Sequence, residues 1–330
     1  MAELIWAGKQ STSSPPPIYS FHTCEVYNAE ETRLPNEYWH NRLILGDKHD
    51  VLPALLPEFV GRINLIYIDP PFMTGRHFAS YSDTWSNNLD TYLQWLYETL
   101  VLLHALLADN GSLYVHLDWR ASHYGRVILD EVFGFAANAQ GPGFKNEIIW
   151  HYQSGGRSTR FFARKHDTIL LYTKSGQYCF HGERVGERRG AQRRNHMRKE
   201  VGEDGHIHWT IRSSGRLYNY DEDQVMTLAD VWSDISHLQQ KDPERNGYAT
   251  QKPAALLERI ILASSEENDL VLDCFCGSGV TPTVAEQLGR RWIACDQNPD
   301  AIKATRERLL AREHVRSFIV QQVKEVNEIC

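Results

Sequence analysis

Two short motifs carry side chains suited to chemistry, and each directly follows an apolar run. The first is the turn Asp69-Pro70-Pro71-Phe72, after Ile63–Ile68. Two prolines stiffen this turn, so the Asp69 carboxylate and the Pro70 carbonyl form a fixed pair of hydrogen-bond acceptors beside the Phe72 ring. A planar amino group with two N–H donors matches that pair. An aromatic amino group is a weak nucleophile, and stabilising the positive charge that develops on its nitrogen makes it reactive. The alternative interpretation is that the motif is only a stiff turn after a strand.

The second motif is a glycine-rich turn. Leu270–Leu272 leads into Asp273-Cys274-Phe275-Cys276-Gly277-Ser278-Gly279. Glycine lets the backbone approach a ligand closely, and the following helix N-terminus offers unpaired N–H donors. Asp296 ends the next apolar run and is placed to accept the two hydroxyls of a ribose. The motif therefore predicts a pocket for a ribose-bearing ligand.

The residues after the glycine turn refine this prediction. Pro282 stands where a dinucleotide-binding fold needs glycine against a pyrophosphate, which counts against a nicotinamide dehydrogenase. We expect Thr281 to be the N-cap of a helix that Gly289 ends. Cys274 and Cys276 suggest a metal pair, but no matching pair exists elsewhere in the sequence. Small buried side chains are therefore the favoured interpretation.

These motifs need a scaffold that brings strand ends together. Alternating strands and helices predict an α/β fold with a doubly wound parallel sheet and helices on both faces. Ligands bind beyond the carboxyl ends of such strands, so strand-end carboxylates should share one rim, unless an individual Asp only caps the next helix. Five apolar runs end in Asp47, Asp69, Asp118, Asp273 and Asp296, and the expected helices cover 89–108, 254–264 and 301–313.

The charge distribution bears on the partner. The net charge of the 330 residues is −7, which looks wrong for a nucleic-acid binder. Residues 155–200, however, hold twelve basic and four acidic side chains, a net +8 that leaves −15 elsewhere. We expect no membrane span, no secretory signal and no disulfide framework, hence a cytoplasmic protein. The polar, proline-rich start predicts a flexible arm over residues 1–17.

In combination, these features resemble the S-adenosylmethionine-dependent DNA amino-methyltransferases, which methylate the exocyclic nitrogen of adenine or cytosine. Asp69-Pro70-Pro71-Phe72 looks like the catalytic tetrapeptide of the family. Residues 273–279 look like its cofactor loop, with Cys274 in place of the usual proline. The catalytic turn precedes the cofactor loop, as in the permuted group called beta. The resemblance covers most of the chain and implies a Rossmann-like methyltransferase sheet with a small target-recognition insert.

The resemblance also implies a set of site residues. Thr250-Gln251-Lys252-Pro253 is similar to the segment that contacts the methionine end of the cofactor. Asp296 matches the ribose-binding acid, and Asp47 matches the acid near the adenine. We therefore expect catalysis by the tetrapeptide Asp69, Pro70, Pro71 and Phe72, without a metal. The expected cofactor-binding residues are Asp47, Lys252, Asp273, Phe275, Cys276, Gly277, Ser278, Gly279, Asp296 and Gln297.

Under this resemblance the basic insert has a function. Residues 175–239 correspond to the target-recognition region, between catalytic-core segments 18–174 and 240–330. The run Glu187–Asn195 lacks apolar periodicity, which predicts a loop or small irregular insert. Trp150 and Phe161–Lys174 resemble the hairpin strands that flank the target-base pocket. Basic side chains would hold phosphates or read base edges, and the candidates are Arg184, Arg188, Arg189, Arg193 and Arg194.

Asp at the first position of the tetrapeptide goes mainly with adenine N6 in this family. The expected activity is therefore site-specific methylation of an adenine that has left the stack of duplex DNA. Cytosine N4 is the alternative, and RNA is a less favoured substrate. A protein-glutamine methyltransferase would carry Asn in place of Asp69, and a non-catalytic DNA-binding module would not need that carboxylate. A homodimer and a cognate restriction endonuclease are further candidate partners.

Overall fold

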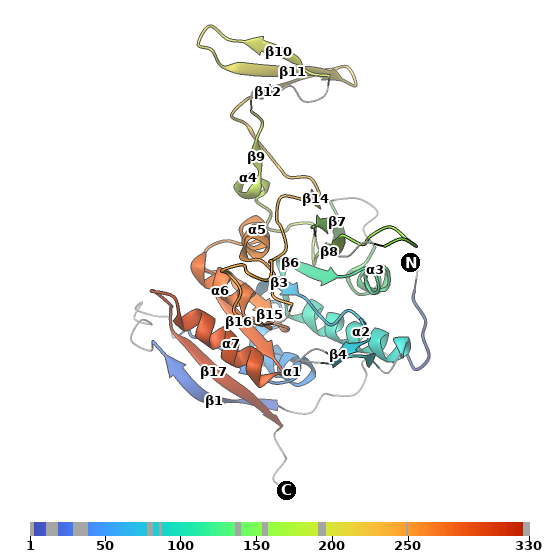
Figure 1. The fold of residues 1–330 in the computed structure, drawn as a ribbon, viewed down its shortest axis with the longest axis vertical. Coiled ribbons are helices and arrows are strands. Elements are labelled where there is room, and N and C mark those ends of the chain that lie inside the picture. Colours follow the sequence, from blue (N-terminus) through green and yellow to red (C-terminus); the bar gives the residue numbers. More distant parts are fainter. Residues whose placement is uncertain are drawn as a thin grey trace. The chain divides into compact units, whose positions relative to one another are not determined.

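The computed structural model describes residues 3–10, 19–28, 39–77, 82–85, 88–135, 140–153, 158–190, 196–248 and 250–325. The chain divides into two compact units (Figure 1). The larger unit comprises Met1–Cys179 and Asp230–Cys330, and the smaller comprises Phe180–Ala229. The smaller unit lies within the range 175–239 that the sequence indicated for target recognition.

The larger unit is built on a ten-stranded sheet. Its strands are β1 (Tyr19–Tyr27), β2 (Asn41–Leu45), β3 (Ile63–Ile68), β6 (Leu107–Leu117), β7 (Gly143–His151), β8 (His166–Thr173), β14 (Val231–Trp232), β15 (Leu270–Asp273), β16 (Arg291–Asp296) and β17 (Phe318–Glu325). The strand order is β1-β17-β2-β16-β15-β3-β6-β8-β7-β14. The six strands from β17 to β6 are parallel, whereas β1 and β8 run antiparallel to their neighbours. The strands β4 (Arg76–His77) and β5 (Ser82–Asp83) form a separate pair.

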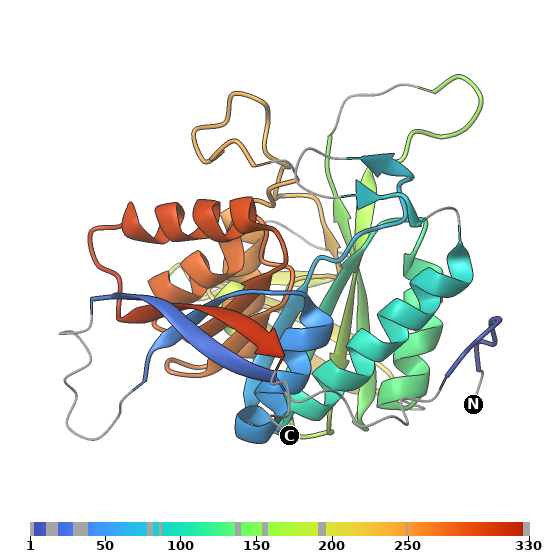
Figure 2. The ribbon, with the colours of Figure 1, turned by 90° about the horizontal axis from the view of Figure 1, so that it is seen from below.

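Helices cover both faces of this sheet (Figure 2). One face packs against α1 (Lys48–Phe59), α2 (Leu89–Leu106) and α3 (Ser122–Phe133), and the other against α5 (Ala254–Ser264), α6 (Val280–Gln287) and α7 (Pro299–Leu310). Successive side chains of β3 alternate between the two cores: Ile66 and Ile68 face the first group, and Leu65 and Tyr67 the second. Burial on both faces explains the nearly continuous apolar runs and confirms the predicted doubly wound α/β fold. Within the described ranges, no helix is both long and apolar enough to cross a membrane.

The boundary between α2 and β6 differs from the sequence prediction. The predicted helix extended to Ala108, but α2 ends at Leu106 and the strand begins at once with Leu107. Leu107 pairs with Ile63 of β3 and is fully buried, and Ala108 is buried as well. Burial in the sheet therefore determines the conformation of these two apolar residues, which local periodicity assigned to the helix.

The first residues are also packed rather than loose. Trp6 is 6% exposed, and its indole N–H donates to Gln94 of α2 at 3.1 Å. The Lys9 ammonium lies 2.7 Å from Glu131 of α3. Residues 3–10 therefore do not behave as the flexible arm expected for 1–17, because an aromatic ring and a cation attach them to two helices. Residues 11–17 of that arm lie outside the described part of the chain.

The smaller unit contains regular structure, although the run Glu187–Asn195 within it predicted a loop or a small irregular insert. β10 (Arg198–Val201), β11 (Ile207–Ser213) and β12 (Arg216–Asp221) form an antiparallel sheet, and β9 (Glu187–Arg188) pairs with β13 (Val225–Met226). A short helix, α4, covers Gly182–Val185. The fully buried Trp209 anchors this unit, and its indole donates to the Gly190 carbonyl at 3.2 Å. Cross-strand pairing organises this segment, and short, mostly exposed strands leave little apolar periodicity to detect.

Candidate active site

Four of the five strand-end carboxylates line one cavity of about 840 Å³ in the larger unit. They are Asp47, Asp69, Asp273 and Asp296, which follow or end β2, β3, β15 and β16. The parallel order of these strands brings their carboxyl ends to one rim, as predicted. Asp118, the fifth, is not part of the cavity lining. Its carboxylate accepts from the Arg120 N–H and forms an ion pair with that side chain, so it stabilises the turn before α3.

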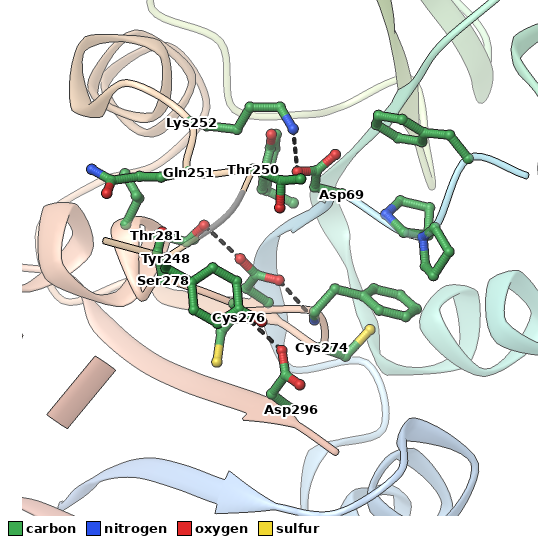
Figure 3. Close-up of a pocket in the computed structure, with 18 of the residues that line it drawn as sticks. Asp69, Tyr248, Thr250, Gln251, Lys252, Cys274, Cys276, Ser278, Thr281 and Asp296 are labelled. Atoms are coloured by element: carbon green, nitrogen blue, oxygen red, sulfur yellow. Dashed lines mark hydrogen bonds and ion pairs between the residues drawn. The ribbon is translucent and has the colours of Figure 1, made fainter. Parts of the chain in front are cut away.

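Asp273 and Asp296 hold the glycine turn in shape (Figure 3). Asp273 accepts hydrogen bonds from the Phe275 N–H at 2.9 Å and from the Thr281 hydroxyl at 2.6 Å. Asp296 accepts from the Gly277 N–H at 2.9 Å. Thr281 is therefore not the predicted N-cap. Gly279 occupies that position with φ 76°, and the Thr281 side chain turns inward to the Asp273 carboxylate instead.

Burial raises the pKa of both carboxyl groups. The pKa of Asp273 rises to about 7, first through burial and then through the charges of Asp69 and Asp296, against the hydrogen bonds from Thr281 and Phe275. Burial also raises the pKa of Asp296, although N–H donors oppose the shift. The charges of Asp69 and Asp296 act on Asp273, so a cationic ligand in this pocket would stabilise the ionised carboxylates.

Cysteine side chains fill the space around this turn. Cys274 is 3% exposed and Cys276 is 5% exposed, which confirms the predicted small buried side chains. Burial raises the pKa of both thiols, and of Cys295 on the neighbouring strand, well above the usual value. These cysteines are therefore neutral packing groups rather than reactive thiolates.

Asp47 and Phe275 belong to the cavity lining. Asp47 caps α1 by accepting from the His49 N–H at 2.8 Å and also lines the cavity. Between them lies Lys48, whose ammonium sits 4.0 Å from the centre of the Trp95 ring and 6.0 Å from that of Phe275. Burial lowers the pKa of Lys48 to about 8. Sequence reasoning missed this lysine, because no motif distinguishes a lysine at a helix start that is buried by distant aromatic rings.

A buried carboxylate supports the Asp-Pro-Pro-Phe turn. The carboxylate of Asp83, fully buried, accepts from the backbone N–H groups of Phe72, Met73 and Thr74 at 2.8–3.2 Å. It accepts further hydrogen bonds from the Thr74 hydroxyl and from the Trp85 indole. One carboxylate therefore fixes the chain directly after the tetrapeptide. Sequence reasoning missed this role, because Asp83 belongs to no motif.

A lysine contacts the carboxylate of the tetrapeptide. Lys252 Nζ forms an ion pair with Asp69 Oδ2 and lies 5.4 Å from the centre of the Phe72 ring (Figure 3). The other oxygen, Asp69 Oδ1, is buried and has no hydrogen-bond partner among the described residues. In this structure Lys252 therefore connects the segment Thr250-Gln251-Lys252-Pro253 to the tetrapeptide by holding one oxygen of Asp69, a contact additional to the cofactor contact expected of it.

A buried polar network supports the turn from behind. The Phe72 ring stacks on His116, with centroids 5.9 Å apart. His116 Nδ1 lies 2.9 Å from the Tyr67 hydroxyl, and His116 Nε2 lies 3.1 Å from Asp167. Tyr152 also donates to Asp167, at 2.8 Å. Burial by itself would raise the pKa of Asp167, but these hydrogen bonds and the charges of His116 and Lys252 hold that pKa below its usual range. Tyr67, Tyr152 and Asp167 line the cavity beside the tetrapeptide.

The structure brings the two predicted groups of residues together. All four residues of the tetrapeptide line the cavity. Nine of the ten expected cofactor residues line it as well, and the exception is Gly279. A Cβ atom at Gly279 would lie 2.7 Å from the Thr305 Cα, so this glycine permits close packing of the turn on α7. All the residues named in the lining of this cavity belong to the larger unit.

The five candidate arginines have different surroundings within the smaller unit. Arg184 and Arg188 are exposed, and Arg188 lies 3.3 Å from Asp223. Arg189 is only 3% exposed: its guanidinium lies 4.5 Å from the centre of the Tyr220 ring and contacts Met197 and Met226. It is therefore a core residue, and the expectation that Arg189 contacts DNA needs correction. Arg193 and Arg194 lie outside the described residues.

Comparison with known proteins identifies the family. The model of the N6/N4 DNA methylase family matches residues 63–307. Type II methyltransferase M.HpaI of Haemophilus parainfluenzae is 30% identical over 75% of this chain and 68% of its own length. DNA adenine methyltransferase YhdJ of Escherichia coli K12 is 29% identical over 90% of this chain and 91% of its own.

Solved structures share the fold at lower identity. The cytosine-N4-specific PvuII DNA methyltransferase superposes with a TM-score of 0.54 at 21% identity, covering 83% of this chain and 88% of its own. The M1.HpyAVI–SAM complex gives 0.53 at 18% identity, covering 81% and 98%. With the glycine turn and the Asp-Pro-Pro-Phe turn in one cavity, the chain belongs to the N6/N4 DNA methylase family of S-adenosylmethionine-dependent methyltransferases.

Proposed function

We propose that this protein transfers a methyl group from S-adenosylmethionine to the N6 amino group of a flipped-out adenine in duplex DNA. The observation that carries the proposal is the Asp69 carboxylate, which has one oxygen held by Lys252 and one buried oxygen without a partner among the described residues. Leaving a buried acceptor unsatisfied costs about 1–3 kcal/mol. Asp69 Oδ1 is therefore prepared for an N–H donor that the substrate supplies.

The residues around Asp69 suit an aromatic amine. The Pro70 carbonyl supplies the second acceptor, and the Phe72 ring, stacked on His116, offers a face for the base. Tyr92 donates to the Pro71 carbonyl at 3.1 Å, and Asp83 fixes the following backbone, so the acceptors are set before the substrate arrives. Acceptors placed in advance stabilise the positive charge on nitrogen at little reorganisation cost. Asp69 can then accept the proton that the amino group loses.

The glycine-turn half of the cavity fits the cofactor. Each Asp296 oxygen accepts one backbone N–H, from Gly277 or Asn298, and a carboxylate oxygen retains capacity for a further donor such as a ribose hydroxyl. Phe275 and Trp95 offer ring faces for the adenine moiety. The buried Asp273 lines the cavity, and its carboxylate form, which the charges of Asp69 and Asp296 disfavour, is stabilised by a positive charge there. Bound S-adenosylmethionine supplies an electrophilic methyl group on a cationic sulfur.

Two arguments support adenine as the target. Asp69 heads the tetrapeptide, and in the family that the sequence resembles Asp at this position goes mainly with adenine N6. One relative, which aligns with 90% of this chain and 91% of its own length, is named a DNA adenine methyltransferase. Cytosine N4 is the second candidate, because a cytosine-N4-specific enzyme shares the fold. The target-recognition role of residues 175–239, a homodimer and a restriction partner remain predictions.

The test is to express the chain in bacteria that lack their own DNA methyltransferases and to sequence the DNA by a method that distinguishes N6-methyladenine from N4-methylcytosine. We expect N6-methyladenine within one short sequence, and none with Asp69→Ala. N4-methylcytosine at the modified sites would refute the choice of base. Methyl transfer to RNA but not to DNA, measured with labelled cofactor, would refute the substrate class.

A further inference from the structure

An aromatic and basic cluster stands beside the cavity at the tip of the β7–β8 hairpin. Phe162 is 98% exposed, Phe161 is 57% exposed, and Trp119, which follows β6, is 41% exposed. Arg164 joins them: its guanidinium lies 3.6 Å from the centre of the Trp119 ring and 4.7 Å from that of Phe161. Single exposed apolar residues need no explanation, but two exposed rings grouped around an arginine, with the exposed Phe162 next to them in the chain, indicate an interaction surface.

The hairpin connects this cluster to the active site. Its strands pair as far as Tyr152, whose N–H donates to the Lys165 carbonyl at 2.9 Å. Trp150, Tyr152 and Asp167, at the base of the tip, line the cavity that contains Asp69. The green loop between β7 and β8 projects beyond the sheet (Figure 2). The described part of the tip, Ser158–Arg164, is therefore only a few residues from the place proposed for the target base.

The charge of the tip selects the partner. Arg160 and Arg164 are exposed on it, and Arg120, 4.6 Å from the Trp119 ring centre, lies at its edge. Two copies of such a cluster would repel each other, whereas a nucleic-acid backbone complements it. Aromatic rings stack on bases, and arginines bind phosphates. Ring faces and cations at one tip therefore match double-stranded DNA better than a second copy of this chain.

We propose that the hairpin tip enters the duplex when the target base leaves it, and that Phe162 stacks on the bases left exposed. This inference rests on the proposed DNA substrate but not on the choice of adenine. Extruding a base sacrifices its stacking and pairing, and an inserted apolar side chain replaces part of that stacking. Phe162 would thus stabilise the opened duplex, while Arg160 and Arg164 would hold its phosphates.

The test compares two DNA duplexes that contain the methylation site found by sequencing. In one the target base is paired, and in the other it faces an abasic site, which makes extrusion easy. The single-turnover methylation rate of Phe162→Ala should fall about 5- to 150-fold on the paired duplex, the range for loss of one aromatic–base stack. On the abasic duplex, Phe162→Ala should methylate at close to the wild-type rate. Phe162→Trp keeps a stacking face and should remain active on both.

The matched control is Phe135→Ala. Phe135 is 62% exposed, but it follows the far end of α3, about 18 Å along the helix from the Trp119 end. This variant should behave as wild type on both duplexes. Binding of S-adenosylmethionine should be equal for all variants, which shows that each is folded.

Three results would overturn the inference. They are an unchanged rate for Phe162→Ala on paired DNA, an equal loss on paired and abasic DNA, and a wild-type dimer that Phe162→Ala converts to a monomer in light scattering. If sequencing finds methylated cytosine, the proposed base fails, and the same pair of duplexes built on cytosine tests the hairpin independently.

Discussion

The buried carboxyl group of Asp273 makes a specific prediction about stability and pH. Its pKa rises from 3.8 to about 7 in the folded protein, mainly through burial. Between these values the folded state binds a proton that the unfolded state has released. The stability that this group contributes is therefore present at low pH and is lost as the pH rises toward and through 7. The sign is opposite to that of an ordinary ion-paired aspartate.

The size of the effect follows from the pKa. One pKa unit corresponds to about 1.4 kcal/mol, and about two units separate pH 5 from the folded-state pKa. Ionisation of Asp273 should thus lower the free energy of unfolding by about 3 kcal/mol between pH 5 and pH 8. Asp273→Asn removes the ionisation but retains the shape. Its amide oxygen can accept from the Phe275 N–H, and its amide N–H can donate to the Thr281 hydroxyl.

The assay is urea unfolding at pH 5 and pH 8, followed by tryptophan fluorescence, for wild type and Asp273→Asn. The variant should gain about 3 kcal/mol relative to wild type between the two pH values. Asp300→Asn, at an exposed position of α7, should follow the wild type. If Asp273→Asn and wild type lose stability in parallel, Asp273 is ionised over the whole range and the reasoning from burial is wrong.

Four further outcomes are expected. Lys252→Met should slow methyl transfer about 10- to 100-fold because it releases the Asp69 carboxylate, and Lys252→Arg should restore part of the rate. If calorimetry shows that Lys252→Met changes only the cofactor affinity, the lysine contacts the cofactor and does not position Asp69. Asp83→Asn should reduce kcat about 100-fold without changing cofactor affinity, because an amide N–H faces the backbone donors of the turn; an unchanged kcat would contradict this. Asp296→Ala should weaken cofactor binding about 10- to 150-fold by calorimetry, through loss of charged hydrogen bonds; equal affinity would exclude the ribose contact. Gly279→Ala should lower the free energy of unfolding by about 2 kcal/mol in urea, because its φ is 76° and the added Cβ meets Thr305.

The net charge shows how a sequence average can mislead. The +8 of residues 155–200 does not coincide with one unit of the structure, because part of it lies on the β7–β8 hairpin. The smaller unit, Phe180–Ala229, has nine basic and eight acidic side chains, a net charge of only +1. We therefore expect steep salt dependence of DNA binding to involve Arg160 and Arg164 as well as the insert.

Local pattern alone determined the five strands that run into Asp, the two turns and their order along the chain. Apolar runs bounded by Asp, Pro and Gly report burial and turn geometry, both of which depend on near neighbours in sequence. From them follow the doubly wound sheet, the shared rim of carboxylates and the resemblance to DNA amino-methyltransferases. Asp69 and Asp296 were identifiable for that reason.

Only the tertiary structure decided how these residues are held and which neighbours they have. Lys252 forms an ion pair with Asp69, which lies 183 positions away in the sequence. Asp83, which belongs to no motif, accepts hydrogen bonds from the backbone of the catalytic turn. Lys48 is buried by aromatic rings from other elements. Arg189 is a core residue rather than a DNA contact. The Thr281 hydroxyl donates to Asp273, and Thr281 does not cap its helix. Each of these depends on burial and hydrogen bonding between segments that are distant in the chain, and sequence spacing carries no information about such contacts.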